Sequence, residues 1–323
     1  MNLSNRKKKI FITRQIPEIA VNILKKKNYN VHVYNKNIPI PEKELLKNIK
    51  DADAVISLLS DNFNPRIIDE MKKCKVIANY AVGFNNIDVA YARSKNIIVT
   101  NTPDVLTDST ADLAITLALS CARRVLEGDK MIRTGKFKGW EPKLLLGVEL
   151  KGKNFGILGA GRIGSATAFR AKAFGANILY CSNSKKEELE KNTGAKKVSL
   201  NKLLKESDFI SVHLPLNKKT YHLINKENLK FLKKSSILIN TARGEIVDEK
   251  ELIKILKNKN IFAAGFDVYE NEPRINAELI SLDNVVLLPH IGSATKDTRD
   301  AMAELAAKNV INVMEGKKPV TPV

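Results

Sequence analysis

The sequence predicts an α/β protein of two doubly wound parallel-sheet domains with a cleft between them. Short apolar runs alternate with stretches of helical spacing along almost the whole chain, which is typical of a parallel sheet covered by helices. The chain has 323 residues, and at roughly 150 residues per domain this length favours two domains. Hydrophobic residues make up 44% and charged residues 28%, near globular averages, which excludes wholesale disorder.

Strands and helices alternate in the first hundred residues. Apolar runs predict strands over residues 9–13, 30–34, 54–58 and 76–79. Helical spacing predicts helices over residues 17–26, 41–50 and 65–72. A long apolar helix is expected over residues 104–121, and Asp108 or Ser109 is expected to cap it.

A second series of strands begins at Asn154. Apolar runs predict strands over residues 154–158, 178–181, 209–213, 237–240, 263–268 and 285–288. Helices are expected over residues 162–174 and 296–314. No run of 18 apolar residues occurs, so no membrane-spanning helix is expected.

The formal net charge of +19 raises the question of a polyanionic partner. A nucleic-acid site would combine arginines with aromatic stacking surfaces, whereas the lysines here are scattered. We therefore expect a solvated surface that attracts small anions, and neither a nucleic-acid nor a membrane partner. The three cysteines have no metal or disulfide spacing, and the N-terminus has no long apolar signal segment. A cytoplasmic protein without a metal site is expected.

A glycine-rich turn follows the strand at 154–158. Gly159, Gly161 and Gly164 form a GxGxxG pattern between that strand and an alanine-rich helix, which predicts a dinucleotide site. Gly159 permits the turn, Gly161 admits a pyrophosphate and Gly164 allows close packing of helix and strand. The amides of Arg162 and Ile163 open the helix, whose N-terminus favours anions.

The next strand lacks the acid that usually holds a ribose 2′-hydroxyl. Ser182, Asn183, Ser184 and Lys185 stand at that place, and no carboxylate appears before Glu187. An aspartate would repel a 2′-phosphate, whereas hydroxyl, amide and ammonium groups can bind it. We therefore predict a preference for NADPH, with NADH possible.

Polar residues follow three strands of the second series. Arg243 follows the strand at 237–240, carboxylates at 270 and 272 follow the next strand, and His290 follows the last. The carboxyl ends of parallel strands share one edge of the sheet, where ligands bind. A histidine can protonate a carbonyl oxygen, a carboxylate can orient the imidazole, and an arginine can grip a substrate carboxylate. The pattern predicts a reductase of 2-oxo acids.

The other histidines are weaker candidates for that role. His32 lies in an alternating strand, His213 is placed to line the adenine side of a cofactor site, and His222 lies in a lysine-rich polar stretch.

Several longer motifs resemble the D-isomer-specific 2-hydroxyacid dehydrogenase family over essentially the whole chain. They are residues 79–88 (NYAVGFNNID), 101–112 (NTPDVLTDSTAD), 159–164, 240–244 (NTARG), 266–267 and 289–295 (PHIGSAT). Within the family, residues 58–61 (LLSD) and 139–142 (GWEP) most resemble glyoxylate/hydroxypyruvate reductases and the related 2-ketogluconate reductases.

The resemblance implies roles for matched positions. Arg243 would bind the substrate carboxylate, His290 would be the general acid and Glu272 its partner. The amides of Val82 and Gly83 would hold the substrate carboxylate, and Leu59 and Trp140 would shape the pocket, Trp140 in some relatives from a neighbouring subunit. The cofactor would also contact three further groups of positions: Thr110 near the phosphates, Thr241, Ala242 and Asp267 at the nicotinamide end, and Gly292 beside His290.

The resemblance also implies a domain division. Residues 1–100 with 291–323 would form the substrate-binding domain, and residues 101–290 the dinucleotide-binding Rossmann domain. The helix near 104–121 would be a hinge and part of a homodimer interface.

The expected activity is hydride transfer from NADPH or NADH to a small 2-oxo acid, giving a D-2-hydroxy acid. Glyoxylate, hydroxypyruvate and 2-ketogluconate remain open as substrates. A nicotinamide-sensing interaction protein on the same fold is the alternative from another class.

Overall fold

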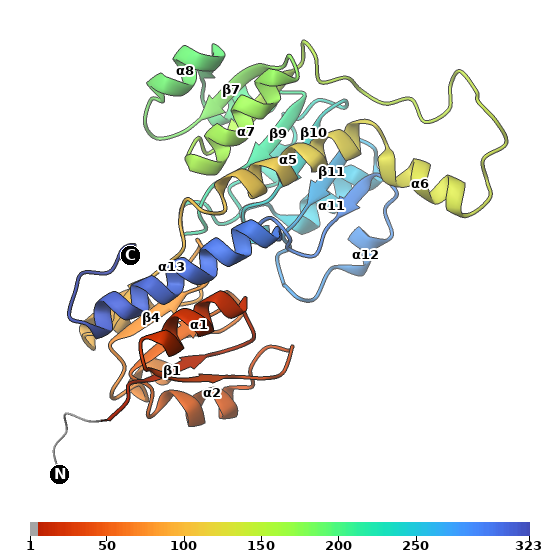
Figure 1. Ribbon diagram of the computed structural model, residues 1–323. Helices are drawn as coiled ribbons and strands as arrows, with labels where there is room; N and C mark the ends of the chain where they lie inside the picture. Colours follow the sequence, from red (N-terminus) through yellow and green to blue (C-terminus); the bar gives the residue numbers. More distant parts are fainter. Residues whose placement is uncertain (1–5) are drawn as a thin grey trace. The chain divides into compact units, whose positions relative to one another are not determined.

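The computed structural model describes residues 6–323, which fall into two compact units. One unit comprises the described residues up to Leu106 together with Ser293–Val323, and the other comprises Thr107–Gly292 (Figure 1).

The first unit contains a five-stranded parallel sheet in the order β2-β1-β3-β4-β5. Its strands are β1 (Lys9–Ile12), β2 (Asn30–Val33), β3 (Ala54–Ser57), β4 (Val76–Asn79) and β5 (Ile98–Thr100). Every residue of β3 and β4 is buried. These central strands are covered on both faces, which is why they are continuous apolar runs in the sequence.

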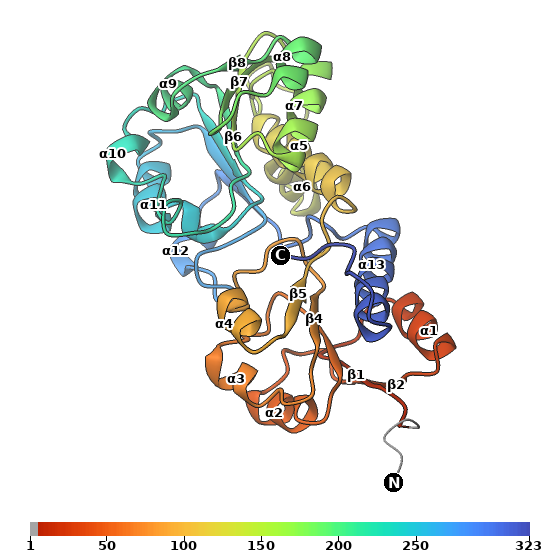
Figure 2. The ribbon, with the colours of Figure 1, turned by 90° about the vertical axis from the view of Figure 1, so that its left-hand side faces the viewer.

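Five helices cover this sheet. They are α1 (Glu18–Lys26), α2 (Glu42–Ile49), α3 (Pro65–Asp69), α4 (Val89–Ser94) and α13 (Lys296–Met314). The last helix returns from the far end of the chain and packs on β3, β4 and α1 (Figure 2). Local caps start several of them: the Asn64 side chain accepts the amide of Ile67 at the start of α3, and Thr295 accepts the amide of Thr298 at the start of α13.

The second unit contains a seven-stranded parallel sheet in the order β12-β11-β10-β9-β6-β7-β8. Its strands are β6 (Asn154–Leu158), β7 (Asn177–Cys181), β8 (Lys196–Lys197), β9 (Phe209–Val212), β10 (Ile237–Asn240), β11 (Ala263–Phe266) and β12 (Val285–Leu287). Its helices are α5 (Thr107–Ala122), α6 (Val125–Arg133), α7 (Arg162–Ala173), α8 (Glu187–Thr193), α9 (Leu200–Glu206), α10 (Lys226–Leu229), α11 (Glu249–Lys257) and α12 (Ala277–Ile280).

Successive residues of the central strands point to opposite faces and feed two hydrophobic cores. Ile237 and Ile239 of β10 join the core beneath α5 and α7, whereas Leu238 joins the core beneath α9 and α11. All neighbouring strands are parallel, so the segments after β6, β9, β10, β11 and β12 emerge at one edge. These two parallel-sheet units confirm the predicted fold class.

The predicted cap of the long apolar helix is wrong. The helix α5 begins at Thr107, so Asp108 and Ser109 lie inside its first turn. The Asp108 carboxylate instead accepts a hydrogen bond from Arg170 of α7 at 2.8 Å. The Asp108 carboxylate therefore takes part in a contact between α5 and α7 and does not cap α5.

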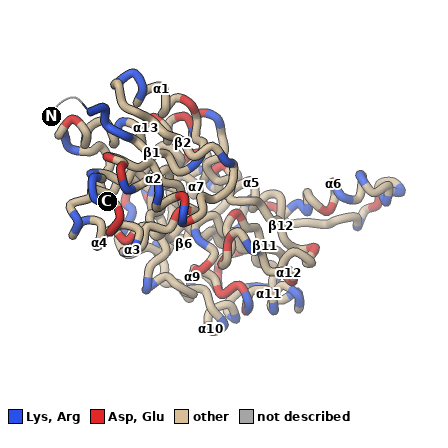
Figure 3. The backbone as a smooth tube through the Cα atoms, turned by 90° about the horizontal axis from the view of Figure 1, so that it is seen from below, with Lys and Arg blue, Asp and Glu red and all other residues tan. Residues whose placement is uncertain are grey.

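Lys and Arg are spread over both units and interspersed with Asp and Glu (Figure 3). Many lysines have an acidic neighbour, such as Lys95 with Asp69 at 2.7 Å and Lys233 with Asp208 at 2.8 Å. Within residues 6–323, none of the helices has the length and apolarity needed to cross a membrane.

Candidate active site

The glycine turn joins β6 to α7 in a conformation that its glycines require. Gly159 has φ of +101°, and a Cβ there would lie 2.7 Å from the carbonyl oxygen of His213. A Cβ on Gly164 would lie 2.1 Å from the carbonyl oxygen of Gly159. No atom lies within 4 Å of the place that a Cβ of Gly161 would take. Two glycines therefore allow close packing, and the third leaves open space beside the N-terminus of α7.

The residues around this turn fit a dinucleotide. The open space at Gly161 adjoins the amides of Arg162 and Ile163 in the first turn of a twelve-residue helix. After β10, the hydroxyl oxygen of Thr241 is buried and has no hydrogen-bond partner among the described residues. An unpaired buried hydroxyl is costly, and a polar ligand at this edge would satisfy it.

Hydrogen bonds that involve a tyrosine and a glutamate hold the loop after β7 in place. The buried Tyr180 hydroxyl accepts the amide of Lys186 at 2.9 Å and donates to Glu190 at 2.6 Å. The Lys185 ammonium lies 3.4 Å from Glu190. The hydrogen bond from Tyr180, together with Lys185, lowers the pKa of Glu190. The predicted cluster of Ser182, Asn183, Ser184 and Lys185 thus has an acid beside it that sequence spacing did not indicate.

Arg243 lies on a loop that the preceding strand holds in place. The Asn240 side chain accepts the amide of Ala242 at 3.0 Å and donates to the carbonyl of Arg243 at 2.9 Å. The guanidinium donates to the Ala242 carbonyl at 2.7 Å. Burial lowers the pKa of Arg243, and the charges of Glu272 and Glu245 act against that shift.

Glu272 and His290 are in direct contact. His290 Nδ1 lies 2.8 Å from Glu272 Oε2, while Glu272 Oε1 accepts the amide of Tyr269 at 2.9 Å. Burial acts to raise the pKa of Glu272, but the hydrogen bond and charge of His290, the Tyr269 amide and Arg243 together hold that pKa below its ordinary value. The carboxylate therefore stays ionised beside the ring. Because it occupies Nδ1, Nε2 is the atom that can exchange a proton with a substrate.

Asp267, Thr110 and Gly292 support the loop that carries His290. Asp267 is buried, and its two oxygens accept the amides of Ile291 and Gly292, both at 2.7 Å. The Thr110 hydroxyl donates to the carbonyl of Gly292 at 3.2 Å. Burial raises the pKa of Asp267, while the two amides and His290 act against the rise. These residues fix the backbone next to the imidazole.

His213 is a poor proton donor in this structure. Burial lowers its pKa to about 3, and its Nε2 lies 2.8 Å from the Ser211 hydroxyl. The ring is therefore neutral near pH 7.

In the first unit, Val82 and Gly83 follow β4. Their carbonyl oxygens accept hydrogen bonds from side chains, and their amides can donate to a ligand. Asn101 donates to the carbonyl of Val82 at 2.8 Å, and Asn79 donates to the carbonyl of Gly83 at 2.8 Å. No hydrogen bond from the amide of Val82 or Gly83 is found among residues 6–323. Neighbouring amides with no other acceptor form a site for an anionic oxygen.

A buried polar network that sequence reasoning missed lies beneath Leu59. Asp61 Oδ2 accepts the Thr13 hydroxyl at 2.5 Å and the Leu58 amide at 2.8 Å. The Asn86 side chain donates to the carbonyls of Leu58 and Asp61 at 3.1 and 3.0 Å. This network fixes the turn on which Leu59 stands, and the Leu59 side chain is 42% exposed. Single residues of such a network carry no sequence signal because their partners are distant in the chain.

Trp140 does not pack into its own unit. It lies in the irregular stretch between α6 and β6, and its side chain is 83% exposed. If Trp140 lines a substrate pocket, as predicted, it must contact a surface outside the core of its own unit.

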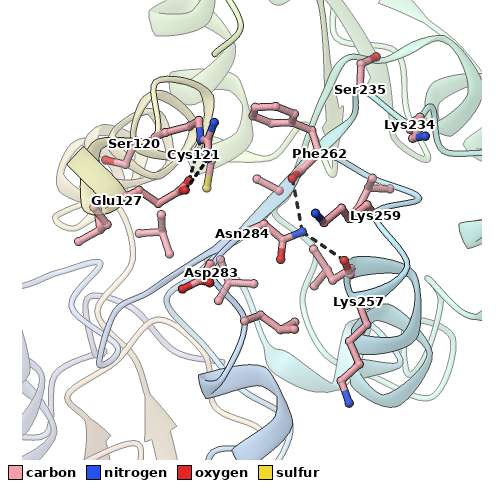
Figure 4. A pocket seen from close by; sticks show the side chains of 18 of the residues that line it. Ser120, Cys121, Glu127, Lys234, Ser235, Lys257, Lys259, Phe262, Asp283 and Asn284 are labelled. Carbon is pink, nitrogen blue, oxygen red and sulfur yellow. Dashed lines mark hydrogen bonds and ion pairs between the residues drawn. The ribbon is translucent and has the colours of Figure 1, made fainter. Parts of the chain in front are cut away.

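A cavity of about 820 Å³ is lined by residues that precede β10, β11 and β12, at the amino edge of the seven-stranded sheet (Figure 4). Arg243 and His290 follow β10 and β12 at the opposite edge. Leu256, Phe262 and Val286 contribute to its apolar floor, and Lys234 and Lys259 are among its lining residues. Arg124, which precedes α6, also lines it and holds Glu127 through two hydrogen bonds of 2.9 and 2.6 Å. None of the predicted site residues is among the lining residues.

Comparison with known proteins identifies the family. The family model of the D-isomer specific 2-hydroxyacid dehydrogenase NAD binding domain matches residues 115–292. A glyoxylate reductase of Pyrococcus horikoshii is 49% identical over 321 residues, which cover 98% of this chain and 96% of that protein. The chain belongs to the D-isomer specific 2-hydroxyacid dehydrogenases. It is thus an oxidoreductase that uses a nicotinamide cofactor, and the predicted family is confirmed.

Solved structures of similar proteins share the whole fold of this dehydrogenase. A Thermus thermophilus protein is 41% identical with a TM-score of 0.92, covering 98% of this chain and 99% of that one. An NADPH-dependent glyoxylate/hydroxypyruvate reductase from Sinorhizobium meliloti, solved in complex with NADP and malonate, is 30% identical with a TM-score of 0.85, covering 98% and 97%.

The buried carboxyl of Asp61 predicts a pH-dependent stability difference. Burial raises its pKa, although the Thr13 hydroxyl and the Leu58 amide act against the rise. A carboxyl whose pKa is raised by folding stabilises the fold below the unfolded pKa of about 3.9 and loses that contribution as pH rises through the folded pKa. The Asp61→Asn variant keeps one accepting oxygen and carries no charge. We expect its Tm to exceed the wild-type Tm by a few degrees at pH 7.

The gap between the two melting temperatures should close as pH falls toward about 4. Asp69→Asn is the matched control, because the hydrogen bond from Lys95 lowers the pKa of Asp69. That variant should lose stability at pH 7 and recover relative to the wild type in acid. A lower Tm for Asp61→Asn across the whole pH range would contradict the expected cost of burying the charge.

Proposed function

We propose that this dehydrogenase reduces a small 2-oxo acid, glyoxylate or hydroxypyruvate, to the D-2-hydroxy acid, with NADPH preferred. The contact between Glu272 and His290, on the edge that also carries Arg243 and the glycine turn, is the observation that carries the proposal. The names of the Pyrococcus and Sinorhizobium relatives support the same substrates.

The two units have different roles in this proposal. In the unit of Thr107–Gly292, Gly161 and the neighbouring helix N-terminus would hold the phosphates of the dinucleotide, and Thr241 would hold its nicotinamide end. The other unit presents the amides of Val82 and Gly83 to the substrate carboxylate. Arg243 binds the same carboxylate with its planar, permanently charged guanidinium. Leu59 restricts the space for the substrate chain, so short oxo acids fit best.

The chemistry divides between cofactor and protein. The bound reduced nicotinamide supplies a hydride for the carbonyl carbon. His290 donates the proton from Nε2 to the carbonyl oxygen, which completes the hydroxyl group. Glu272 holds Nδ1 and stabilises the charged ring before the proton leaves. Arg243 polarises the carbonyl through its positive charge.

The preference for NADPH rests on the loop after β7. Ser182, Asn183 and Ser184 offer polar groups and no carboxylate at the ribose position. The amide of Lys186 donates to the Tyr180 hydroxyl, and the carbonyl of Asn183 accepts a hydrogen bond from Lys197 at 3.1 Å. A loop fixed in this way presents Lys185 to a 2′-phosphate at small entropic cost.

A homodimer is the assembly that the exposed apolar side chains favour. The arm, defined as residues 125–147, projects from its unit (Figure 1), and no residue of α6 is buried. Six of its large apolar residues are exposed, namely Val125, Leu126, Ile132, Phe137, Trp140 and Leu146. A surface of this kind marks a contact site. In a dimer, the arm would form part of the contact between subunits, and Trp140 would line the partner's substrate pocket.

The general-acid role predicts a large kinetic effect at His290. The wild type should oxidise NADPH when glyoxylate or hydroxypyruvate is added, and 2-ketogluconate should serve poorly. His290→Ala should lower kcat by about 10²–10⁴-fold, which is the usual worth of general acid catalysis. NADPH binding, followed by fluorescence, should survive because the glycine turn is untouched. Near-normal turnover in this variant would remove His290 from the mechanism.

The cofactor preference is testable at Lys185. The wild type should have a lower KM for NADPH than for NADH. Lys185→Ser should raise the KM for NADPH roughly tenfold, since a hydrogen bond to a charged group contributes about 1.5–3 kcal/mol, and leave the KM for NADH unchanged. Lys191→Ser, a change on the exposed side of α8, should alter neither value. A wild-type preference for NADH would defeat the assignment.

The dimer is testable by sedimentation. The wild type should have about twice the chain mass of 36.0 kDa. Charging the arm with Ile132→Lys and Phe137→Lys together should yield monomers at micromolar concentration. Ile38→Lys is the control, because Ile38 is also exposed, at 52%, but lies in the other unit. A wild-type monomer, or a variant that stays dimeric, would place the contact elsewhere.

A further inference from the structure

His222 lies in the connection between β9 and α10, close to two loops of the candidate site. It has a left-handed backbone, with φ of +46°. Such a conformation is strained for a residue other than glycine and persists where surrounding contacts hold it. The proposed mechanism gives this residue no role, and the sequence places it in a lysine-rich polar stretch.

The backbone of His222 is tied to the loop of Arg243. Its amide donates to the carbonyl of Glu245 at 2.8 Å, two residues after Arg243. The chain then pairs alongside the same loop, because Ile224 bridges Val247 and the Asp248 amide donates to the Ile224 carbonyl at 2.8 Å. These contacts use main-chain atoms and do not depend on the imidazole.

The ring of His222 is tied to the loop of Glu272. Nε2 lies 2.7 Å from Glu270 Oε1, and both side chains are largely buried, at 28% and 21% exposed. Tyr221 stacks on the imidazole with ring centres 4.1 Å apart. Nδ1 lies 3.9 Å from Asp248. The ring therefore has a fixed orientation, with one carboxylate in hydrogen-bond contact and a second nearby.

The two loops that His222 touches also touch each other. A Cβ on Gly244 would lie 1.9 Å from the carbonyl carbon of Tyr269, so the Arg243 loop rests directly on the Tyr269–Glu270 peptide. The Glu270 amide donates a hydrogen bond to Glu249 Oε2 at 3.4 Å. Two residues further on, Glu272 holds Nδ1 of His290 at 2.8 Å. A shift of the Glu270 segment would therefore move Glu272 and, through it, the imidazole of His290.

We propose that His222 is a positioning residue for the reduction, and that its hydrogen bond to Glu270 sets the placement of Glu272 against His290. The proposal rests on the proposed function, because it assigns His222 an effect on proton donation. The loop of Arg243, which binds the substrate in this proposal, is held to the His222 segment by backbone hydrogen bonds. These bonds do not involve the imidazole ring. Loss of the ring therefore affects the proton donor more than the binding of substrate or cofactor.

The test compares His222→Asn with His222→Gln. Asparagine tolerates the left-handed backbone but is too short to reach Glu270, whereas the glutamine amide nitrogen can replace Nε2. His222→Asn should lower kcat by about 10–100-fold, as expected for a small misplacement of a catalytic group, with the KM values for oxo acid and NADPH within about twofold. His222→Gln should restore most of kcat. His32→Asn, a histidine stacked on Phe11 in the other unit, should change nothing.

A double variant separates positioning from general damage. In the His290→Ala background, His222→Asn should cause no further loss of kcat, because residues that act as a unit are not additive. A merely structural role would lower kcat by the same factor in both backgrounds. Equal loss in both backgrounds, an unchanged kcat, or a rise in KM without a fall in kcat would each overturn the proposal.

A readout independent of activity is hydrogen exchange. Peptides that cover residues 268–273 should exchange faster in His222→Asn than in the wild type, and those that cover α7 should not. If the wild type reduced no 2-oxo acid, the proposed function would fail, and exchange alone would decide whether His222 holds this loop. Unchanged exchange over 268–273 would refute the positioning role.

Discussion

The parallel pairing of β10, β11 and β12 is the constraint on which the candidate site depends. Because the strands run in one direction, the loops of Arg243, Glu272 and His290 start from one edge of one sheet. Arg243 and His290 are 47 residues apart in sequence, yet they follow β10 and β12, the two strands on either side of β11. Their direction fixes only the starting points, however. The final placement depends on short contacts between loops, such as the approach of Gly244 to the Tyr269 peptide.

The sequence predicted the strands well because strands buried on both faces leave a strong signal. Runs such as Ile237–Asn240 and Val76–Asn79 are continuous apolar segments, and the structure has strands with those bounds. The contact between Glu272 and His290 was also predictable, since both follow strands of one sheet. Helix starts were less predictable: Asp108 resembles a cap in sequence, but its carboxylate bonds Arg170 of a helix that lies later in the chain.

What sequence reasoning missed was the set of side chains that hold the loops. Asn86 reaches the carbonyl of Leu58, and Glu190 meets the hydroxyl of Tyr180. Each of these contacts joins two positions whose spacing matches neither a helix nor a strand. The polar residue at each position resembles an ordinary surface residue until the tertiary structure supplies its partner. His222 belongs to the same class, because its partner Glu270 is 48 residues away.

The supporting side chains follow a common physical logic in both units. Asn79, Asn240 and Asp267 each lie at or just after the carboxyl end of a strand, and all three are buried. Their side chains form hydrogen bonds with backbone groups of the loops that follow. A buried polar group is costly unless it is paired, so each of them restricts the loop to conformations that keep the pair. The groups that those loops carry, the amides of Val82 and Gly83 and the imidazole of His290, are thereby oriented before any ligand arrives. Such preorganisation lets electrostatic groups act on a transition state without first reorganising. In both units, buried polar side chains therefore support the loops at the edge where binding and chemistry are proposed.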